Sequence, residues 1–257
     1  MNSLQRYTCK AAIIGLCLAA ASGAYAQVGS IGSAVLFPRV WNDIPLATLT
    51  TVNVYPSLIT FNEANVSGSG YANRDVWRFS NDGLTAYQFQ NNDYFNASFN
   101  LILTGGSDTY YPEAGWLFST ANVGDIQSIV TTSGVVAQFG GISYNNFNPP
   151  LVYTAGETFT LGMSYFQAGD GNNALQYSVS DGVTTVYSPV TEFAPGAGIG
   201  NGSMLGGYFQ IPQNPSDPSN SGAAVFSDIS ITPVPEPATL ALLGLGIVPL
   251  LLRRRRI

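Results

Sequence analysis

Strict alternation of apolar and polar residues in the middle of the chain is the feature that most restricts the fold. In Thr158–Tyr165 apolar residues occupy every second position, and threonine, glycine or serine fills the positions between them. The same period recurs in Leu175–Ser180, and the Asp181-Gly182 pair that follows is typical of a hairpin turn before Val183–Tyr187. Successive side chains of a strand point to opposite faces, so a period of two predicts strands with one buried face. These three segments therefore predict a three-stranded meander.

Weaker strand patterns continue through the rest of the chain between residues 27 and 233, and we find no helical periodicity there. The further strand candidates are Thr48–Tyr55, Val76–Phe79, Thr85–Phe89, Asn96–Leu103, Ile126–Val130, Val135–Phe139 and Ala223–Ile231. Ala194–Gly207 and Pro212–Gly222 are rich in glycine or proline and predict loops. About ten short strands separated by turns are typical of an all-β sandwich or jelly roll. We therefore predict a single jelly-roll-like β-sandwich domain over residues 27–233.

The residue types available for chemistry are few. Residues 27–233 contain fourteen acids and three bases, Arg39, Arg74 and Arg78, which gives a net charge of −11. The chain has no histidine, and its only lysine and both cysteines lie within residues 1–26. This inventory excludes Ser-His-Asp and Cys-His catalytic sites, His/Cys zinc sites and disulfides from the predicted domain. Three arginines on an acidic protein also argue against nucleic-acid binding, which depends on neutralising phosphates.

Residues 1–26 have the parts of a secretory signal peptide. Two basic residues precede the apolar run Ala11–Ala21, and Ala24 and Ala26 are the small residues of a cleavage site. A buried N-terminal helix is the alternative, but the order of charge, apolar run and small residues argues against it. We therefore predict cleavage by signal peptidase, with a mature chain that begins at Gln27.

Residues 234–257 combine a rigid motif, an apolar run and a basic end. The motif is Pro235, Glu236 and Pro237, and each proline favours extended geometry in the residue before it. The uncharged run Ala238–Leu252 would span about 22 Å as a helix, which is short for a hydrocarbon core of roughly 30 Å. The four terminal arginines favour a cytoplasmic tail, so we predict a short transmembrane helix with the preceding domain on the far side. The arginines of this membrane-stop tail are Arg253, Arg254, Arg255 and Arg256.

This three-part segment resembles the PEP-CTERM sorting signal of Gram-negative bacteria. In that family a membrane-embedded exosortase, a cysteine protease-transpeptidase, recognises the signal and cuts near the motif, often alongside exopolysaccharide production. The resemblance implies an exported protein with an inner-membrane intermediate that then reaches the cell surface or is secreted. It also implies that Pro235, Glu236 and Pro237 are recognition residues for exosortase. An ordinary C-terminal membrane anchor is the alternative.

The order of features over Asn96–Ile231 also resembles that of concanavalin-like jelly rolls. The features are Gly115-Trp116-Leu117-Phe118, a bend at Gly140-Gly141, the predicted meander and a closing strand directly before the C-terminal segment. This resemblance implies a sandwich of two antiparallel sheets.

Aromatic residues are the richest candidates for contact with a ligand. Sugar-binding faces use flat rings with Asn, Asp and Gln around them, and Tyr110, Tyr111, Trp116 and Tyr144 lie in or near such mixtures. We take these four as candidate carbohydrate-binding residues, although aromatic side chains also fill the cores of sandwiches. Tyr110 and Tyr111 cannot both point inward from one strand, so one of them should be exposed.

Two further kinds of site have simpler explanations. Asp170-Gly171-Asn172-Asn173 offers oxygen ligands for calcium, but these are also ordinary turn residues and the EF-hand pattern is missing. We therefore predict no cofactor, with calcium as the alternative. Glycoside hydrolysis needs two carboxylates in one cleft, whereas Glu63, Glu113, Glu157 and Glu192 are far apart in the sequence.

These observations together predict a non-enzymatic protein that is exported to the cell surface or the extracellular matrix. We expect a structural role associated with extracellular polysaccharide. A lectin-like carbohydrate-binding module is the alternative function, and a glycoside hydrolase is a third.

Overall fold

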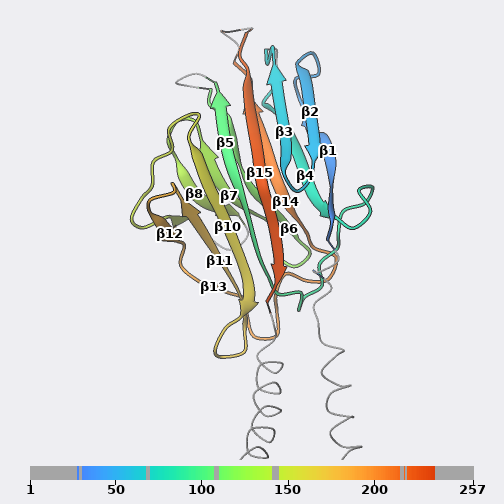
Figure 1. The fold of residues 1–257 in the computed structure, drawn as a ribbon, viewed down its shortest axis with the longest axis vertical. Helices are drawn as coiled ribbons and strands as arrows, with labels where there is room; N and C mark the ends of the chain where they lie inside the picture. The colour runs from blue at the N-terminus through green and yellow to red at the C-terminus, as the bar shows by residue number, and fades with distance from the viewer. Residues whose placement is uncertain are drawn as a thin grey trace, which may run out of the picture.

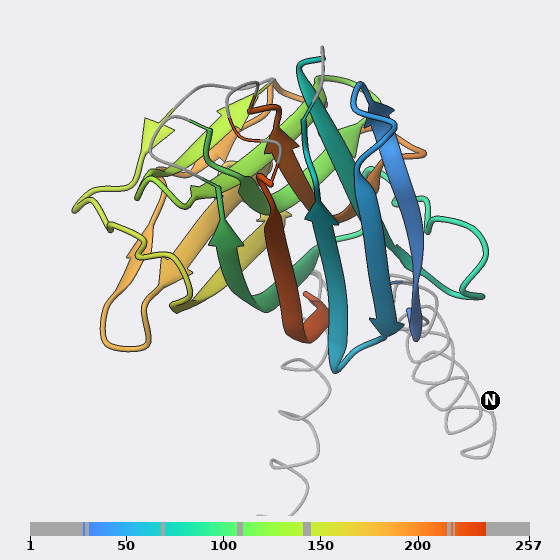
Figure 2. The ribbon, with the colours of Figure 1, turned by 90° about the horizontal axis from the view of Figure 1, so that it is seen from above.

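The computed structural model describes residues 28, 31–67, 70–106, 110–140, 145–214, 217 and 219–234. In these ranges fifteen strands form two antiparallel sheets that pack face to face (Figures 1 and 2). The predicted all-β sandwich is thus confirmed. The predicted signal peptide with its predicted cleavage residues Ala24 and Ala26, and the C-terminal motif, apolar run and arginine tail, lie outside the described residues. Among the described residues, no helix has the length and apolar character needed to cross a membrane.

Sheet A has the strand order β1-β4-β14-β6-β7-β8-β9. Its strands are β1 (Ser33–Asn42), β4 (Ala72–Ser80), β14 (Met204–Pro212), β6 (Glu113–Thr120), β7 (Gly124–Thr131), β8 (Val136–Gly140) and β9 (Asn145–Asn146). Sheet B has the order β12-β11-β10-β5-β15-β3-β2, and β13 also pairs with β11. Its strands are β12 (Thr185–Tyr187), β11 (Asn173–Ser180), β10 (Thr158–Gln167), β5 (Phe95–Gly105), β15 (Gly222–Pro233), β3 (Leu58–Ala64), β2 (Thr48–Val54) and β13 (Thr191–Glu192).

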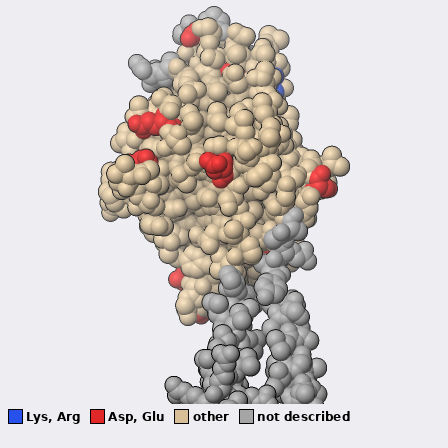
Figure 3. Space-filling model, in the orientation of Figure 1, with Lys and Arg blue, Asp and Glu red and all other residues tan. Residues whose placement is uncertain are grey.

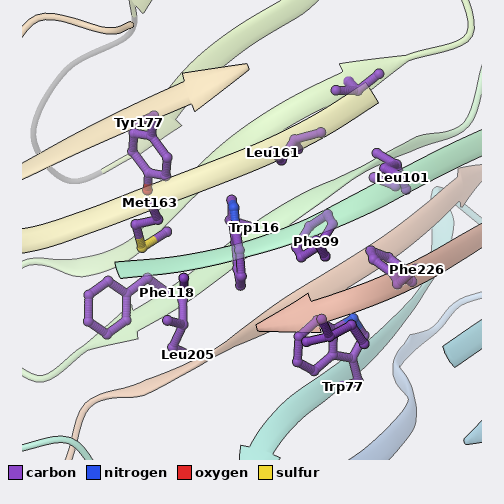
Figure 4. Close-up of a cluster of buried hydrophobic side chains, with 14 of the residues drawn as sticks. Trp77, Phe99, Leu101, Trp116, Phe118, Leu161, Met163, Tyr177, Leu205 and Phe226 are labelled. Atoms are coloured by element: carbon purple, nitrogen blue, oxygen red, sulfur yellow. The ribbon is translucent and has the colours of Figure 1, made fainter. Parts of the chain in front are cut away.

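The core lies between the two sheets and is dominated by aromatic rings (Figure 4). Trp77 and Trp116 from sheet A meet Phe99 and Phe226 from sheet B. The ring centroids of Phe99 and Trp116 are 4.2 Å apart, and those of Trp77 and Phe226 are 5.9 Å apart. Large rings bury much apolar area per residue, so they close the space between two twisted sheets with few side chains.

The predicted meander is confirmed as β10, β11 and β12, which are neighbours in sheet B. The apolar face of β10 points into the core, and Phe159, Leu161, Met163 and Tyr165 are each at most 1% exposed. The polar positions between them face outward or are covered by neighbouring side chains. The period of two in this segment therefore arises because one face of β10 is buried in the core, as the sequence predicts.

Two local predictions were wrong. Thr85–Phe89 forms no strand: Tyr87 and Phe89 are buried as the alternation predicts, but a single bridge, between Phe89 and Ser203, is formed in place of a ladder. Ala194–Gly207 is not loop throughout, since β14 begins at Met204. Strands β1, β3 and β6 also lie where no strand candidate was placed.

Candidate functional site

The outer face of sheet A carries a cleft, and β4 forms part of its floor. Along this strand Trp77 and Phe79 point into the core, so Arg74, Val76 and Arg78 point to the opposite face. Every residue of β4 is nevertheless buried, because its outward side chains are covered from neighbouring strands. An arginine on such a strand is held in a fixed position rather than free in solvent.

The cleft has a volume of about 310 Å³ and is bounded by side chains from five strands of sheet A. The lining residues from β1 are Phe37, Val40 and Trp41, and those from the other strands are Arg74, Val76, Arg78, Leu117, Asp125 and Met204. The three β1 side chains remain partly open to solvent, and Trp41 is 45% exposed. The cleft, which we call the arginine cleft, thus has an apolar wall and a floor with two cations.

Arg74 is fixed between two aromatic rings. Its guanidinium carbon lies 3.9 Å from the ring centroid of Trp41 and 5.1 Å from that of Tyr208. Its Nε donates to Gln210 Oε1 at 2.7 Å, and Glu113 Oε1 lies 4.0 Å from its Nη2. Cation–π contacts of this kind strengthen when the cation is taken out of water, as it is here.

Arg78 ties three strands together from the same face. Its Nη1 donates to the carbonyl oxygens of Leu117 and Met204 at 2.6 and 2.9 Å, and its Nη2 donates to Ser119 Oγ at 2.6 Å. Burial lowers the pKa of Arg78 to about 10, while the charge of Asp125 acts in the opposite direction. Arg78 therefore remains cationic at neutral pH, with neutral oxygens as its direct partners.

Glu113 and Tyr208 form a polar pair beside Arg74. The Tyr208 hydroxyl donates to Glu113 Oε1 at 3.3 Å. Burial raises the pKa of Glu113, and the Arg74 charge and the Tyr208 hydrogen bond offset part of that rise. Burial also raises the pKa of Tyr208 well above its usual value, so the phenol stays protonated and remains a donor.

The described part of the chain is acidic, and most of its few basic residues lie in the arginine cleft. Arg39, Arg74 and Arg78 are the only basic residues in the described part of the chain, and two of them line the cleft. The third, Arg39, is bonded to Glu63 through Nε and Nη2, both at 3.1 Å. The outer face of sheet B shows scattered acidic groups, and basic atoms are seen only at its edge in this view (Figure 3). An anionic or hydroxyl-rich ligand would therefore find its cationic partners in the cleft.

The structure separates the residues that the sequence suggested for carbohydrate binding. Trp116 is fully buried in the core, so its ring cannot stack on a sugar, and this assignment was wrong. Tyr111 is 39% exposed and Tyr110 is half-buried, which agrees with the expectation that one of the pair is exposed. Both lie in the segment before β6 rather than in a strand, and Tyr144 lies outside the described residues.

The candidate calcium loop is an ordinary turn between β10 and β11. Asp170 Oδ1 accepts the backbone N–H of Asn172 at 3.0 Å, and its Oδ2 accepts the Asn172 side-chain amide at 2.6 Å. Both carboxylate oxygens thus have partners within the turn. In the described ranges there is no cluster of three or more His, Cys, Asp or Glu side chains that could hold a metal ion.

The four glutamates considered for glycoside hydrolysis lie in four different settings. Glu63 in β3 is bonded to Arg39, and Glu113 in β6 lies beside Arg74. Glu157 accepts the backbone N–H of Thr154 before β10, and Glu192 lies exposed in β13. None of the four lines the arginine cleft.

Sequence reasoning missed the residues of the cleft, although one signal for it was present. Arg74 and Arg78 are spaced by four, which places them on the same face of a strand. They are also two of only three bases between residues 27 and 233. Trp41 was not predictable as their neighbour, because Pro38 obscures the strand that carries it.

Comparison with known proteins identifies the C-terminal segment. Residues 233–256 match the model of the PEP-CTERM protein-sorting motif. This confirms the resemblance drawn from Pro235, Glu236 and Pro237 and the arginine tail. The chain is thus an exported protein that exosortase processes, that is anchored in the membrane during sorting, and that ends at the cell surface or is secreted.

Solved structures with a similar arrangement of strands include two alginate lyases. The enzyme from Klebsiella pneumoniae is 15% identical with a TM-score of 0.46, and the match covers 73% of this chain and 84% of that one. The enzyme from Corynebacterium sp. is 15% identical with a TM-score of 0.45, covering 74% and 82%. A functionally unknown protein from Saccharomyces cerevisiae is 14% identical with a TM-score of 0.38, covering 75% and 99%. These distant likenesses transfer no activity to this chain. No curated protein matches the sequence.

Proposed function

We propose that this exported chain is a non-enzymatic surface or matrix protein that binds extracellular polysaccharide in the arginine cleft. The observation that carries the proposal is the position of Trp41. Its ring is fixed by contact with the Arg74 guanidinium yet 45% exposed at the wall of the cleft. A rigid, half-exposed indole beside a cation is suited to a ligand that has both apolar faces and polar edges.

A polysaccharide has that combination of surfaces. The C–H faces of its sugar rings can pack on Trp41 and Phe37, and its hydroxyl or carboxylate oxygens can accept hydrogen bonds from Arg74. Arg74 uses its Nε for Gln210, and Glu113 Oε1 lies 4.0 Å from its Nη2, beyond hydrogen-bond distance, so its terminal nitrogens retain donors for a ligand.

The setting of the charged groups favours binding over catalysis. Asp125 is the only carboxylate among the residues that line the cleft, whereas acid–base hydrolysis of a glycosidic bond uses two. Arg78 is engaged by two carbonyl oxygens and a hydroxyl, so it holds strands together. The expected role is therefore retention of polysaccharide at the cell surface.

The test measures retention of the full chain by affinity electrophoresis through gels that contain neutral or acidic polysaccharides. We expect selective retention, and we expect Trp41→Ala to weaken it about tenfold, which corresponds to about 1.4 kcal/mol. Tyr187→Ala is the matched control, because Tyr187 is also an exposed ring but lies on β12 of the other sheet. Equal retention of the Trp41→Ala and Tyr187→Ala chains would show that the polysaccharide does not bind in the arginine cleft. Release of new reducing ends from any polysaccharide would contradict the non-enzymatic role.

A further inference from the structure

Strand β15 is held differently in its two halves. Residues 222–227 pair with β3 on one side and β5 on the other, whereas in the described part of the chain residues 230–233 pair with β5 alone. A register shift between Ser227 and Ser230 separates the two halves, and Asp228 lies within it with a φ of 50°. The end of the strand, next to the sorting motif, is therefore attached along one side only.

Ser230–Val234, which we call the terminal segment, is shallowly packed. Ile231 and Val234 contact the core but are only partly buried, and the other three residues are exposed. The backbone N–H of Val234 donates to the carbonyl oxygen of Tyr94 at 3.0 Å, and Pro235 of the sorting motif follows directly. Segments with few buried contacts open locally at low free energy. Ile229 is 4% exposed and its N–H donates to the Pro56 carbonyl at 2.9 Å, so such an opening ends there.

The sorting motif lies in a narrow space between the folded domain and the membrane. Only Pro235–Pro237 separate Val234 from the apolar run Ala238–Leu252, and three residues span at most about 11 Å. Lipid headgroups occupy roughly 5–8 Å of that distance, and a single helix of an enzyme is about 10–12 Å wide. Figure 1 also shows that the turn between β10 and β11 reaches beyond the end of β15 in the same direction. While the terminal segment stays on β5, a membrane-embedded protease therefore has too little room to enclose the motif.

We propose that the terminal segment leaves β5 to admit exosortase to the sorting motif. Release of Ser230–Val234 adds five residues, or about 17 Å when extended, to the connection between the domain and the membrane. Residues 222–227 remain paired on both sides, so the rest of the sandwich stays folded while the chain is processed. The rate of processing thus depends on how readily the end of β15 opens. This role is independent of the arginine cleft and of any ligand bound there.

A disulfide between β15 and β5 tests whether the segment must leave. Thr232 and Asn96 are exposed register partners, so Thr232→Cys/Asn96→Cys in the full chain places two thiols within reach of each other. We expect processing, followed by pulse-chase labelling, to slow about tenfold or more, because the bonded segment can no longer open. Ala223→Cys/Thr104→Cys is the matched control, since it joins the same two strands where β15 also pairs with β3. Equal processing rates of the two disulfide-bonded chains would overturn the proposal.

A spacer distinguishes lack of room from any other effect of the disulfide. Ten glycine and serine residues inserted between Val234 and Pro235 supply about 17 Å as a flexible coil, which replaces the length that the terminal segment provides on release. The chain that carries both this spacer and the disulfide between positions 232 and 96 should therefore be processed at the normal rate. Processing that stays slow in this chain would overturn the proposal, because room near the membrane would then not be what the disulfide removes.

Hydrogen exchange of the full chain in detergent micelles measures the opening without exosortase. We expect the backbone N–H groups of the terminal segment to exchange about a hundredfold faster than those of residues 224–227, because only the latter lie in the half of β15 that is paired on both sides. The disulfide between positions 232 and 96 should slow exchange in the terminal segment alone. Equal protection of the two halves in the unaltered chain would contradict a segment that opens while the rest of β15 stays paired.

Discussion

Arg74 and Trp41 lie directly opposite each other on β4 and β1, and the guanidinium of Arg74 packs 3.9 Å from the centroid of the Trp41 ring. This contact gives a buried arginine an exposed aromatic neighbour at the wall of the cleft. It also places the ring, the cation and Glu113 in one connected group. The first prediction concerns what this group contributes to stability.

Removal of the Arg74 charge should destabilise the fold through Glu113. Arg74→Met leaves Glu113 half-buried without its cationic neighbour and removes the bond to Gln210, so we expect a loss of about 2–4 kcal/mol at neutral pH. The double variant Arg74→Met/Glu113→Gln should recover part of this loss, as measured by urea unfolding. Additive losses in the double variant would show that the two side chains do not interact.

The buried carboxyl of Asp75 should make the protein less stable as pH rises. Burial raises the pKa of Asp75 to about 7, and the nearby Glu63 charge adds to the rise, while the Arg39 N–H bond and charge oppose it. Because the folded state binds this proton more tightly than the unfolded state, the stabilisation is complete below about pH 4 and is lost as pH rises through about 7. Asp75→Asn can still accept the Arg39 N–H, so above about pH 7 it should be more stable than the unaltered chain.

The control for Asp75 is an acid with the opposite shift. Asp181 accepts the backbone N–H groups of Thr184 and Val183, and these bonds lower its pKa. Its stabilisation is therefore present at neutral pH and lost in acid. Asp181→Asn should lower the melting temperature above about pH 7, where Asp75→Asn raises it. A melting temperature that changes in the same direction in both variants would contradict the opposite pKa shifts of Asp75 and Asp181.

Gly207 should be irreplaceable in β14. A Cβ at this position would overlap the indole nitrogen of Trp77 and the ring of Phe226. Gly207→Ala should therefore cost about 1–3 kcal/mol in urea unfolding, because the core has no room to accommodate it. Gly169→Ala, where a Cβ meets nothing within 4 Å, should change stability by less than about 0.5 kcal/mol. Equal effects at both positions would mean that β14 packs differently.

The sorting motif should control the final location of the chain. Alanine substitution of Pro235, Glu236 and Pro237 should leave export intact but block exosortase processing, so the unprocessed chain accumulates in the membrane fraction. The unaltered chain in cells without exosortase should behave in the same way. Normal surface display or release of the substituted chain would contradict a sorting role for these residues.

The fold was predictable where the sequence period reflects burial on one face only. β10 is such a strand, because its neighbours cover one face and leave the other polar. β4 is predicted only over Val76–Phe79, since Arg74 and Arg78 are buried on its outer face and hide the period in the hydrophobicity pattern. The sequence predicts a loop over the first part of β14, because glycine is common in turns. In the structure Gly207 instead leaves room for the Trp77 ring.

The cleft was less predictable than the fold because it depends on contacts between distant segments. Trp41 and Arg74 meet only once β1 pairs with β4, and Tyr208 reaches Arg74 only through the pairing of β14 with β4. Trp116 was predicted to bind a ligand and is instead buried, because it lies a few residues after the exposed Tyr111 in the sequence but points into the core from β6. The C-terminal sorting motif required no such contacts, because its information lies in consecutive residues.

Tryptophan fluorescence during titration with polysaccharide tests the central claim most directly. The chain has three tryptophans, and Trp77 and Trp116 are fully buried while Trp41 stands in the cleft wall. We predict that a polysaccharide which retains the full chain also changes its fluorescence in a saturable manner, and that Trp41→Phe abolishes the change. Binding that leaves the fluorescence unaltered, or a change that persists in Trp41→Phe, would contradict binding in the arginine cleft.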